Sequence, residues 1–375
     1  MRRNYGQIMN EPAAHPLMKD ILGPAALRVI ADAGMAASPR FDRAAFLDTA
    51  TQGLDALSVM GRVRHIADAL HGALPGDYPH ALAVLRAMGP HVTHAFQGFA
   101  LAEYVARYGL HDVDASMEAL AELTRHGSAE FAIRPFLARD PTRVLAQMRA
   151  WAEHPNEHVR RLASEGARPR LPWATRVPAL KDDPTLAAPI LERLKADHSL
   201  YVRKSVANHL NDIGKDRPDW LVERMAGWSR DDPRTAWIIR HALRSRIKQG
   251  DPAALAIVGA RADVAVTVTD FAITPASIRL GETIAITAAL TSNAESEQRL
   301  VVDYRVHYAR ANGRTAAKVF KWKSFDLAAG ACVSLATRQV IRDFSTRRHH
   351  PGRHEIELLV NGRVMAAAGF DLRAA

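Results

Sequence analysis

The spacing of apolar residues changes once along this chain, near residue 262, and this change constrains the fold more than any other feature of the sequence. From about residue 15 to 260, apolar residues recur at intervals of three and four between Pro, Gly and Asp, which indicates a series of amphipathic helices. Beyond residue 262, apolar and polar residues alternate in short runs, which indicates β-strands. We therefore predict an all-α domain at 1–260 and a β domain at 261–375.

Three segments of the helical part resemble one another. The strings "PNEHVRRLASE", "HSLYVRKSVAN" and "PRTAWIIRHAL" align on Val159, Val202 and Trp237, with steps of 43 and 35 residues. HEAT-like helical repeats have this length and stack into a solenoid, because each repeat buries its apolar face only against its neighbours. The aligned helices carry the basic residues Arg160, Arg161, Arg203, Lys204, Arg240 and His241. These residues form either a basic track along the solenoid or ordinary solvated charges.

The β part fits an immunoglobulin-like β-sandwich. It contains about seven alternating runs, separated by turn residues every 8 to 15 positions. The chain has one cysteine, Cys332, so the sandwich has no internal disulfide. A single cysteine also argues against a cysteine-rich zinc site and favours a reducing cytoplasm. In "KVFKWK" we expect Trp322 to pack in or beside the sandwich core.

The net charge of +10 favours a polyanionic partner, which is either nucleic acid or an anionic membrane surface. The sequence shows no signal peptide, no apolar run of about eighteen residues, and no basic amphipathic segment with clustered large apolar residues. These features argue against a membrane. The string "RRHHPGRH" offers His349, His350 and His354 to a metal, but a basic loop facing DNA is the favoured interpretation. We expect neither a metal nor a cofactor.

Two carboxylates and one tryptophan lie among the basic residues of the helical part. Glu165 lies near the C-terminal end of its helix, where the helix dipole disfavours negative charge, so an arginine or lysine would suit the position better. Glu130, in "RHGSAEFAIRPFL", is expected to open an apolar helix, where capping is the ordinary explanation. Trp173 follows a proline, and a loop residue packed against a repeat is its ordinary interpretation.

The strings "SAEFAIRPF", "HPNEHVRRLASEGARPRLPWA", "YVRKSVANHLNDIGKDRPDW" and "WIIRHALRSRIKQGDPAAL" occur in this order before the β part. In these motifs the chain resembles the AlkC family of bacterial alkylpurine DNA glycosylases. The resemblance covers about residues 80–260 in motifs and the whole chain in architecture. His154 departs from it, since such repeats often carry Asp before the proline. The resemblance implies a HEAT-like domain that cups damaged DNA and an Ig-like domain that helps to close around the duplex.

The resemblance also implies an activity, namely removal of cationic N-methylated bases such as 3-methyladenine from double-stranded DNA. Acceptance of 3-methylcytosine or 7-methylguanine stays open. Glu165 and Glu130 would be the catalytic carboxylates, one of them stabilising the sugar cation and orienting water, and which of the two dominates stays open. Trp173 would be an aromatic wall beside the lesion. The expected DNA-binding residues are Arg160, Arg161, Arg168, Arg170, Arg203, Lys204, Asn208, Arg240, His241, Arg244, Arg347 and Arg348.

No lysine stands out as a Schiff-base nucleophile, so base removal without strand cleavage is expected. We expect a monomer that acts on the nucleoid in the bacterial cytoplasm. The alternative function is a non-catalytic HEAT-repeat scaffold that binds DNA or an acidic protein, since many helical-repeat proteins only bind.

Overall fold

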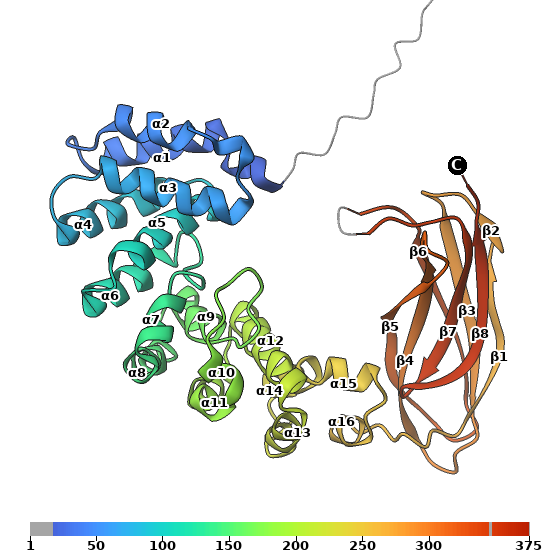
Figure 1. Ribbon diagram of the computed structural model, residues 1–375. Coiled ribbons are helices and arrows are strands. Elements are labelled where there is room, and N and C mark those ends of the chain that lie inside the picture. The colour runs from blue at the N-terminus through green and yellow to red at the C-terminus, as the bar shows by residue number, and fades with distance from the viewer. Residues whose placement is uncertain (1–17, 345–346, 375) are drawn as a thin grey trace, which may run out of the picture. The chain divides into compact units, whose positions relative to one another are not determined.

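The computed structural model describes residues 18–344 and 347–374. Helices fill the first part of the chain, and strands fill the second, which confirms the predicted fold class (Figure 1). The α-helices are α1 (Pro24–Ala37), α2 (Arg43–Thr51), α3 (Val59–Ala73), α4 (Tyr78–Met88), α5 (Ala95–Tyr108), α6 (Val113–Leu123), α7 (Arg134–Arg139), α8 (Pro141–Trp151), α9 (Glu157–Gly166), α10 (Pro178–Asp182), α11 (Ala188–Leu194), α12 (Leu200–Asp216), α13 (Pro218–Ala226), α14 (Pro233–Ala242), α15 (Arg244–Lys248) and α16 (Pro252–Ile257). Short 3-10 helices are η1 (Met18–Leu22), η2 (Leu54–Ala56), η3 (Gly89–His91) and η4 (Pro184–Leu186).

The chain divides into two compact units, Met1–Asp216 and Arg217–Ala375. The secondary structure changes type between Ile257 and Val266, close to the predicted boundary at 260, whereas the compact units part after Asp216. The last four α-helices therefore share a unit with the sandwich. Two glycines with positive φ, Gly250 after α15 and Gly362 between β7 and β8, lie in close contact. A Cβ on Gly362 would lie 2.1 Å from Cα of Gly250, so the backbones approach too closely for a side chain.

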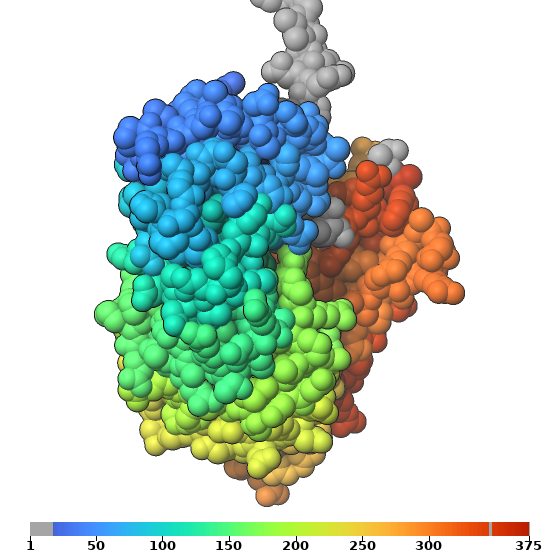
Figure 2. Space-filling view, turned by 60° about the vertical axis from the view of Figure 1, so that its left-hand side comes forward, coloured from blue at the N-terminus to red at the C-terminus, as the bar shows by residue number. Residues whose placement is uncertain are grey.

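In the first unit the helices stack in chain order, as the run of colours from α1 to α12 shows in Figure 2. Side-chain caps account for where many of these helices begin. Asp42, Asp77, Asp112 and Asp140 each accept a hydrogen bond from a backbone N–H in the first turn of the following helix. Each cap is followed by an apolar stripe that faces the interior between neighbouring helices.

Two of the aligned repeats contain the same internal contact. Arg160 on α9 donates from Nη1 to the carbonyl oxygens of His154 and Pro155, both at 2.9 Å. Arg203 on α12 donates from Nη1 to the carbonyls of Asp197 and His198, at 2.7 and 2.9 Å. In α14 the aligned position holds buried Ile238, so the third repeat lacks this contact.

The second unit contains eight strands within its described residues, against the seven or so expected. They are β1 (Val266–Thr274), β2 (Ser277–Ile278), β3 (Thr283–Ser292), β4 (Gln298–Ala309), β5 (Thr315–Leu327), β6 (Cys332–Val340), β7 (Gly352–Val360) and β8 (Arg363–Leu372). One sheet has the order β1-β3-β6, and the other has the order β2-β8-β7-β4-β5. The two sheets bury an apolar core, and Trp322 packs against it, as predicted.

The histidine-rich segment is a loop only as far as Pro351, with Arg348 exposed as predicted, and two of its histidines are buried instead of facing outward. His354 lies in β7, is fully buried, and stacks on Phe370 with ring centroids 5.0 Å apart. His349 is also buried, and it contacts Asp343 through its backbone N–H and its ring. The alternation of β7 explains the burial of His354, which lies on the face of the strand that packs into the core.

Candidate active site

Glu165 is a buried carboxylate near the end of α9. Asn156 caps this helix by accepting a hydrogen bond from the backbone N–H of His158, and Glu165 is the last residue but one, as predicted. Its side chain is 7% exposed. Oε1 accepts a hydrogen bond from Nη1 of Arg168 at 2.6 Å, and Oε2 accepts one from Oγ of Ser205 on α12 at 2.6 Å. Hydrogen bonds from Arg168 and Ser205 therefore compensate Glu165 for its unfavourable position at the C-terminal end of the helix.

Glu130 lies in the turn before α7, not at the start of a helix as we predicted. The helix begins only at Arg134, and no side chain caps it. The carboxylate of Glu130 instead accepts hydrogen bonds from Oγ of Ser128 and Nη1 of Arg161, both at 2.5 Å. A capping role, the ordinary explanation for this residue, does not describe these contacts. Glu130 belongs to a tertiary network.

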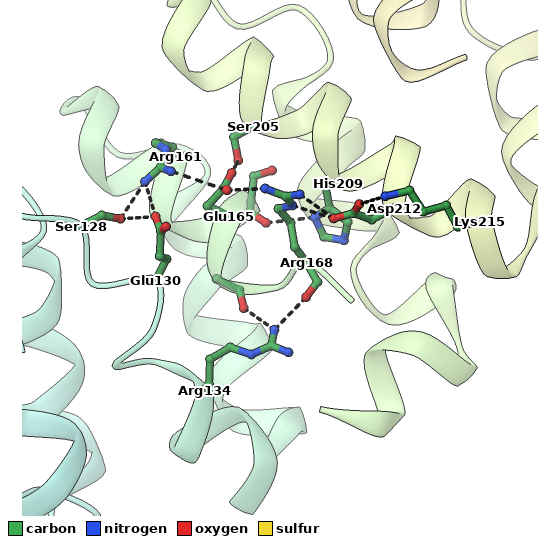
Figure 3. Close-up of polar contacts among 12 residues, drawn as sticks. Ser128, Glu130, Arg134, Arg161, Glu165, Arg168, Ser205, His209, Asp212 and Lys215 are labelled. Carbon is green, nitrogen blue, oxygen red and sulfur yellow. Dashed lines mark hydrogen bonds and ion pairs between the residues drawn. The ribbon is translucent and has the colours of Figure 1, made fainter. Parts of the chain in front are cut away.

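Arg161 joins the two glutamates. Its Nη1 contacts Glu130, and its Nη2 lies 3.6 Å from Oε1 of Glu165, as Figure 3 shows. Although burial opposes the effect, Glu130 and Glu165 raise the pKa of Arg161. The guanidinium carbon of Arg161 lies 4.8 Å from the ring centroid of Tyr201, which is 40% exposed. One cation thus holds two carboxylates beside an accessible aromatic ring.

Arg168 connects Glu165 to a third carboxylate, Asp212 of α12, which we did not predict. Its Nε and Nη2 lie 2.8 and 2.6 Å from Oδ2 of Asp212, which also accepts a hydrogen bond from Lys215 through Oδ1. Buried His209 supports the same region, because its Nδ1–H donates to the carbonyl of Ser164 at 2.9 Å. Burial lowers the pKa of His209 to about 4, so this imidazole is neutral at pH 7.

The sequence contains a pattern that could have indicated Asp212 and its polar neighbours on α12. Ser205, Asn208, Asp212 and Lys215 recur at intervals of three and four, and they therefore lie along one face of α12. A polar stripe on a helix that must pack against its neighbour indicates a buried network. We interpreted Asn208 as a DNA contact and did not extend its pattern to Asp212.

Trp173 lies in the loop after α9, and it does not plug that loop. Its side chain is 55% exposed, and its backbone has φ of 64°, a left-handed conformation that costs a tryptophan energy. It lines a pocket of about 550 Å³ with the cations Arg170, Arg176 and Lys181. A strained, exposed aromatic residue beside cations is a candidate ligand platform.

Arg134 holds this loop. It is 1% exposed, and it donates to the carbonyls of Gly166, Arg168 and Thr175 at 2.8, 2.9 and 2.9 Å (Figure 3 shows the first two). Burial lowers its pKa to about 10. Since the three carbonyls lie at the two ends of the loop, one side chain fixes the segment that presents Trp173.

The residues predicted to bind DNA fall into two groups. Arg160 and Arg203 direct guanidinium nitrogens to backbone carbonyls of their own repeats, and Arg160 also pairs with Asp197 at 2.7 Å. Arg170 pairs with Asp216 at 2.6 Å. Lys204, Arg240 and Arg348 are exposed, while Asn208, His241, Arg244 and Arg347 are partly exposed. Arg347 and Arg348 line a basic pocket of about 650 Å³ in the sandwich, with Arg310 and Lys318.

Within residues 18–344 and 347–374, no three His, Cys, Asp or Glu side chains are grouped so as to hold a metal ion. No helix in these residues has the length and apolar content needed to span a membrane.

The fold and the site define a helical-repeat protein with an Ig-like domain and a buried cluster of carboxylates and arginines. The model of the DNA alkylation repair enzyme family matches residues 124–245, which include this cluster. The model of the C-terminal Ig-like domain of uncharacterised protein YhaZ matches residues 267–374. The chain is also 39% identical to the uncharacterized protein YhaZ of Bacillus subtilis (strain 168) over 335 residues, which cover 89% of this chain and 93% of that protein.

A solved structure extends the similarity to nearly the whole chain. It contains the Pseudomonas fluorescens alkylpurine DNA glycosylase AlkC bound to DNA with an abasic site analog. The two chains are 50% identical and superpose with a TM-score of 0.90, covering 96% of this chain and 100% of that one. The chain belongs to the AlkC family of DNA repair glycosylases, as the motifs predicted.

Proposed function

We propose that this protein is a monofunctional DNA glycosylase that hydrolyses the N-glycosidic bond of cationic methylated bases, such as 3-methyladenine, in duplex DNA of the cytoplasm. The observation that carries the proposal is the pair Glu130 and Glu165, both buried and both held by Arg161. A binding surface for phosphates gains nothing from carboxylates, whereas a reaction that develops positive charge on a sugar does. The family membership of the chain supports the same activity.

The reaction follows from the charges. When the bond between C1′ and the base nitrogen breaks, its electron pair leaves with the cationic base, which becomes neutral, and positive charge develops on the sugar. Glu165 and Glu130 stabilise that charge. A water oxygen then bonds to C1′ and gives its proton to a carboxylate or to solvent, which leaves an abasic site and a free base. Trp173 offers a π-face to the cationic base.

The arrangement of Arg161 explains how the carboxylates stay buried before substrate arrives. Two carboxylates close together repel one another unless a cation compensates them. Because Arg161 compensates them, both carboxylates are charged and in position before the transition state forms. When positive charge then develops on the sugar, they attract it without first having to move. Exposed Lys204, Arg240 and Arg348 are the proposed contacts to backbone phosphates.

Release of bases from methylated duplex DNA tests the proposal. Wild-type protein should release 3-methyladenine, and Glu165→Gln or Glu130→Gln should each lower kcat by about 100-fold. The matched control is Glu118→Gln, a carboxylate that is 76% exposed on α6 and contacts Arg86. The same reactions on 3-methylcytosine and 7-methylguanine define the range of lesions. DNA strands should break only after alkali, because no strand cleavage is proposed.

If wild-type protein releases no base and Glu165→Gln binds duplex DNA more tightly, the chain is a DNA-binding scaffold instead. If Glu118→Gln loses as much activity as the two site variants, the site is assigned wrongly.

A further inference from the structure

A second cluster of charges lies in the second unit, where α14 and α15 meet strands β4 and β5. It lines a pocket of about 410 Å³. Five cations surround this pocket, namely Arg240, Arg244, Lys248, Arg299 and Lys321. Asp303 is the one carboxylate among the lining residues. We call this feature the β4–α15 pocket.

Asp303 is unusual for a buried charge. The residue is 2% exposed, and among the described residues no donor forms a hydrogen bond or an ion pair with its carboxylate. Buried carboxylates nearly always have such partners, because an unpaired one is costly. Burial raises the pKa of Asp303 to about 6, although Lys248 and Lys321 oppose the shift.

A β-bulge between β4 and β5 lies next to Asp303. β4 pairs with β5 as Val302 with Lys323 and Asp303 with Lys321, so Trp322 is an extra residue in β5. A β-bulge redirects side chains and is common beside binding sites. Here it places Lys321 opposite Asp303 at the pocket, while Lys323 does not line the pocket and lies over the ring of Phe325.

We propose that the β4–α15 pocket binds a phosphate group of the DNA backbone, with Asp303 facing that phosphate. The cations supply the attraction. Arg299 is already paired with Asp326, Lys248 donates to the carbonyl of Val319, and Arg240 and Lys321 are exposed at the mouth. An ionised Asp303 repels the phosphate, and a protonated Asp303 donates a hydrogen bond to it. The carboxylate therefore limits how tightly the backbone is held, which favours release from undamaged DNA.

Other groups near Asp303 titrate or carry charge and must be separated from it. Arg305 and His307 follow on β4 and pair with Glu357 of β7, at 2.8 and 3.1 Å. His241 on α14 stacks on Trp237. Because these charged and ionisable groups also lie near the pocket, only a variant of Asp303 itself isolates its effect.

The proposal adds a site to the proposed function and rests on DNA binding, not on catalysis. The test is equilibrium binding of the full chain to a labelled undamaged duplex over a salt series. Lys321→Gln should weaken binding and make the slope of log affinity against log salt shallower by about one. Lys323→Gln, two residues away on the same strand, is the matched control and should leave the slope unchanged. Base release is measured separately, so loss of turnover and loss of this contact are distinguishable.

Asp303→Asn provides the second arm of the test. At pH 8 it should bind the duplex about tenfold more tightly than wild type, because one unscreened negative charge near the phosphate is removed. At pH 5 the two proteins should bind alike. The proposal is overturned if Asp303→Asn equals wild type at both pH values, or if Lys321→Gln and Lys323→Gln show the same slope. Inorganic phosphate at constant ionic strength should compete with the duplex for wild type and not for Lys321→Gln. Binding of inorganic phosphate that leaves duplex affinity unchanged would instead assign the pocket to free phosphate.

Discussion

The Nε atom of Arg160 lies 2.7 Å from Oδ2 of Asp197, and this buried ion pair joins the α9 repeat to the segment that precedes α12. Both side chains are less than a tenth exposed, at 7% and 5%. Arg160 was predicted as a phosphate contact, but a guanidinium held this way is expected to stabilise the solenoid more than it binds DNA.

Arg160→Ala should therefore destabilise the protein by about 3 kcal/mol, because it leaves Asp197 buried without its partner. Exposed Lys204, one position beyond the equivalent Arg203, is the matched control. Lys204→Ala should leave stability unchanged and make the salt dependence of DNA binding shallower by about one. Urea unfolding and duplex binding check both variants. Equal stability of the two proteins would show that Arg160 is not a structural residue.

The aligned motifs predicted the fold, the repeats and the position of Glu165, because all three depend on periodic patterns within short segments. They did not predict the role of Arg134. Its partners are backbone carbonyls 32 to 41 residues away, and a backbone carbonyl leaves no mark in a sequence. The polar stripe on α12 did include Asp212, but its ion pair with Arg168, which is 44 residues earlier, could not be predicted from that stripe.

Arg134→Met should lower the free energy of unfolding by about 3 kcal/mol, since three hydrogen bonds to buried or partly buried carbonyls are lost. It should also change the fluorescence of Trp173, because the loop is no longer fixed at both ends. The difference between spectra recorded with and without Trp173→Phe isolates that signal. Arg139→Met is the matched control on the same helix, where an exposed arginine donates to the carbonyl of Leu110. If Arg134→Met leaves the Trp173 signal unchanged, the loop is not held by this side chain.

Substitutions of Trp173 can distinguish its effect on stability from its effect on activity. Trp173→Gly and Trp173→Ala both remove the ring, but only alanine keeps the steric cost of φ at 64°. The glycine variant should thus be more stable than the alanine variant by about 1 kcal/mol. Both should release 3-methyladenine more slowly than wild type, and the loss should be greater than for a neutral lesion. If both variants instead unfold several kcal/mol more easily and keep their activity, Trp173 is a structural plug.

The buried carboxylate of Asp303 should also make the free energy of unfolding depend on pH in the absence of DNA. Burial raises its folded pKa to about 6, above the ordinary value of 3.8 for an aspartate, so the folded protein binds a proton more tightly than the unfolded chain does. Stability from this group is therefore fully present below pH 4 and is lost as the pH rises to 6. The loss amounts to about 3 kcal/mol, because one pKa unit corresponds to about 1.4 kcal/mol.

Asp303→Asn should remove that loss. It should raise the free energy of unfolding by up to about 3 kcal/mol at pH 8, and the gain should shrink to nothing near pH 4. Denaturant unfolding of both proteins across this range checks the prediction, with Asp326→Asn as the control, because Asp326 is an exposed aspartate on β5 that pairs with Arg299. A gain that is independent of pH would mean that packing around the new amide, and not the removed charge, accounts for the change. Since the same charge opposes the bound phosphate in the β4–α15 pocket, the stability gain and the tighter DNA binding at pH 8 should fade together as the pH falls.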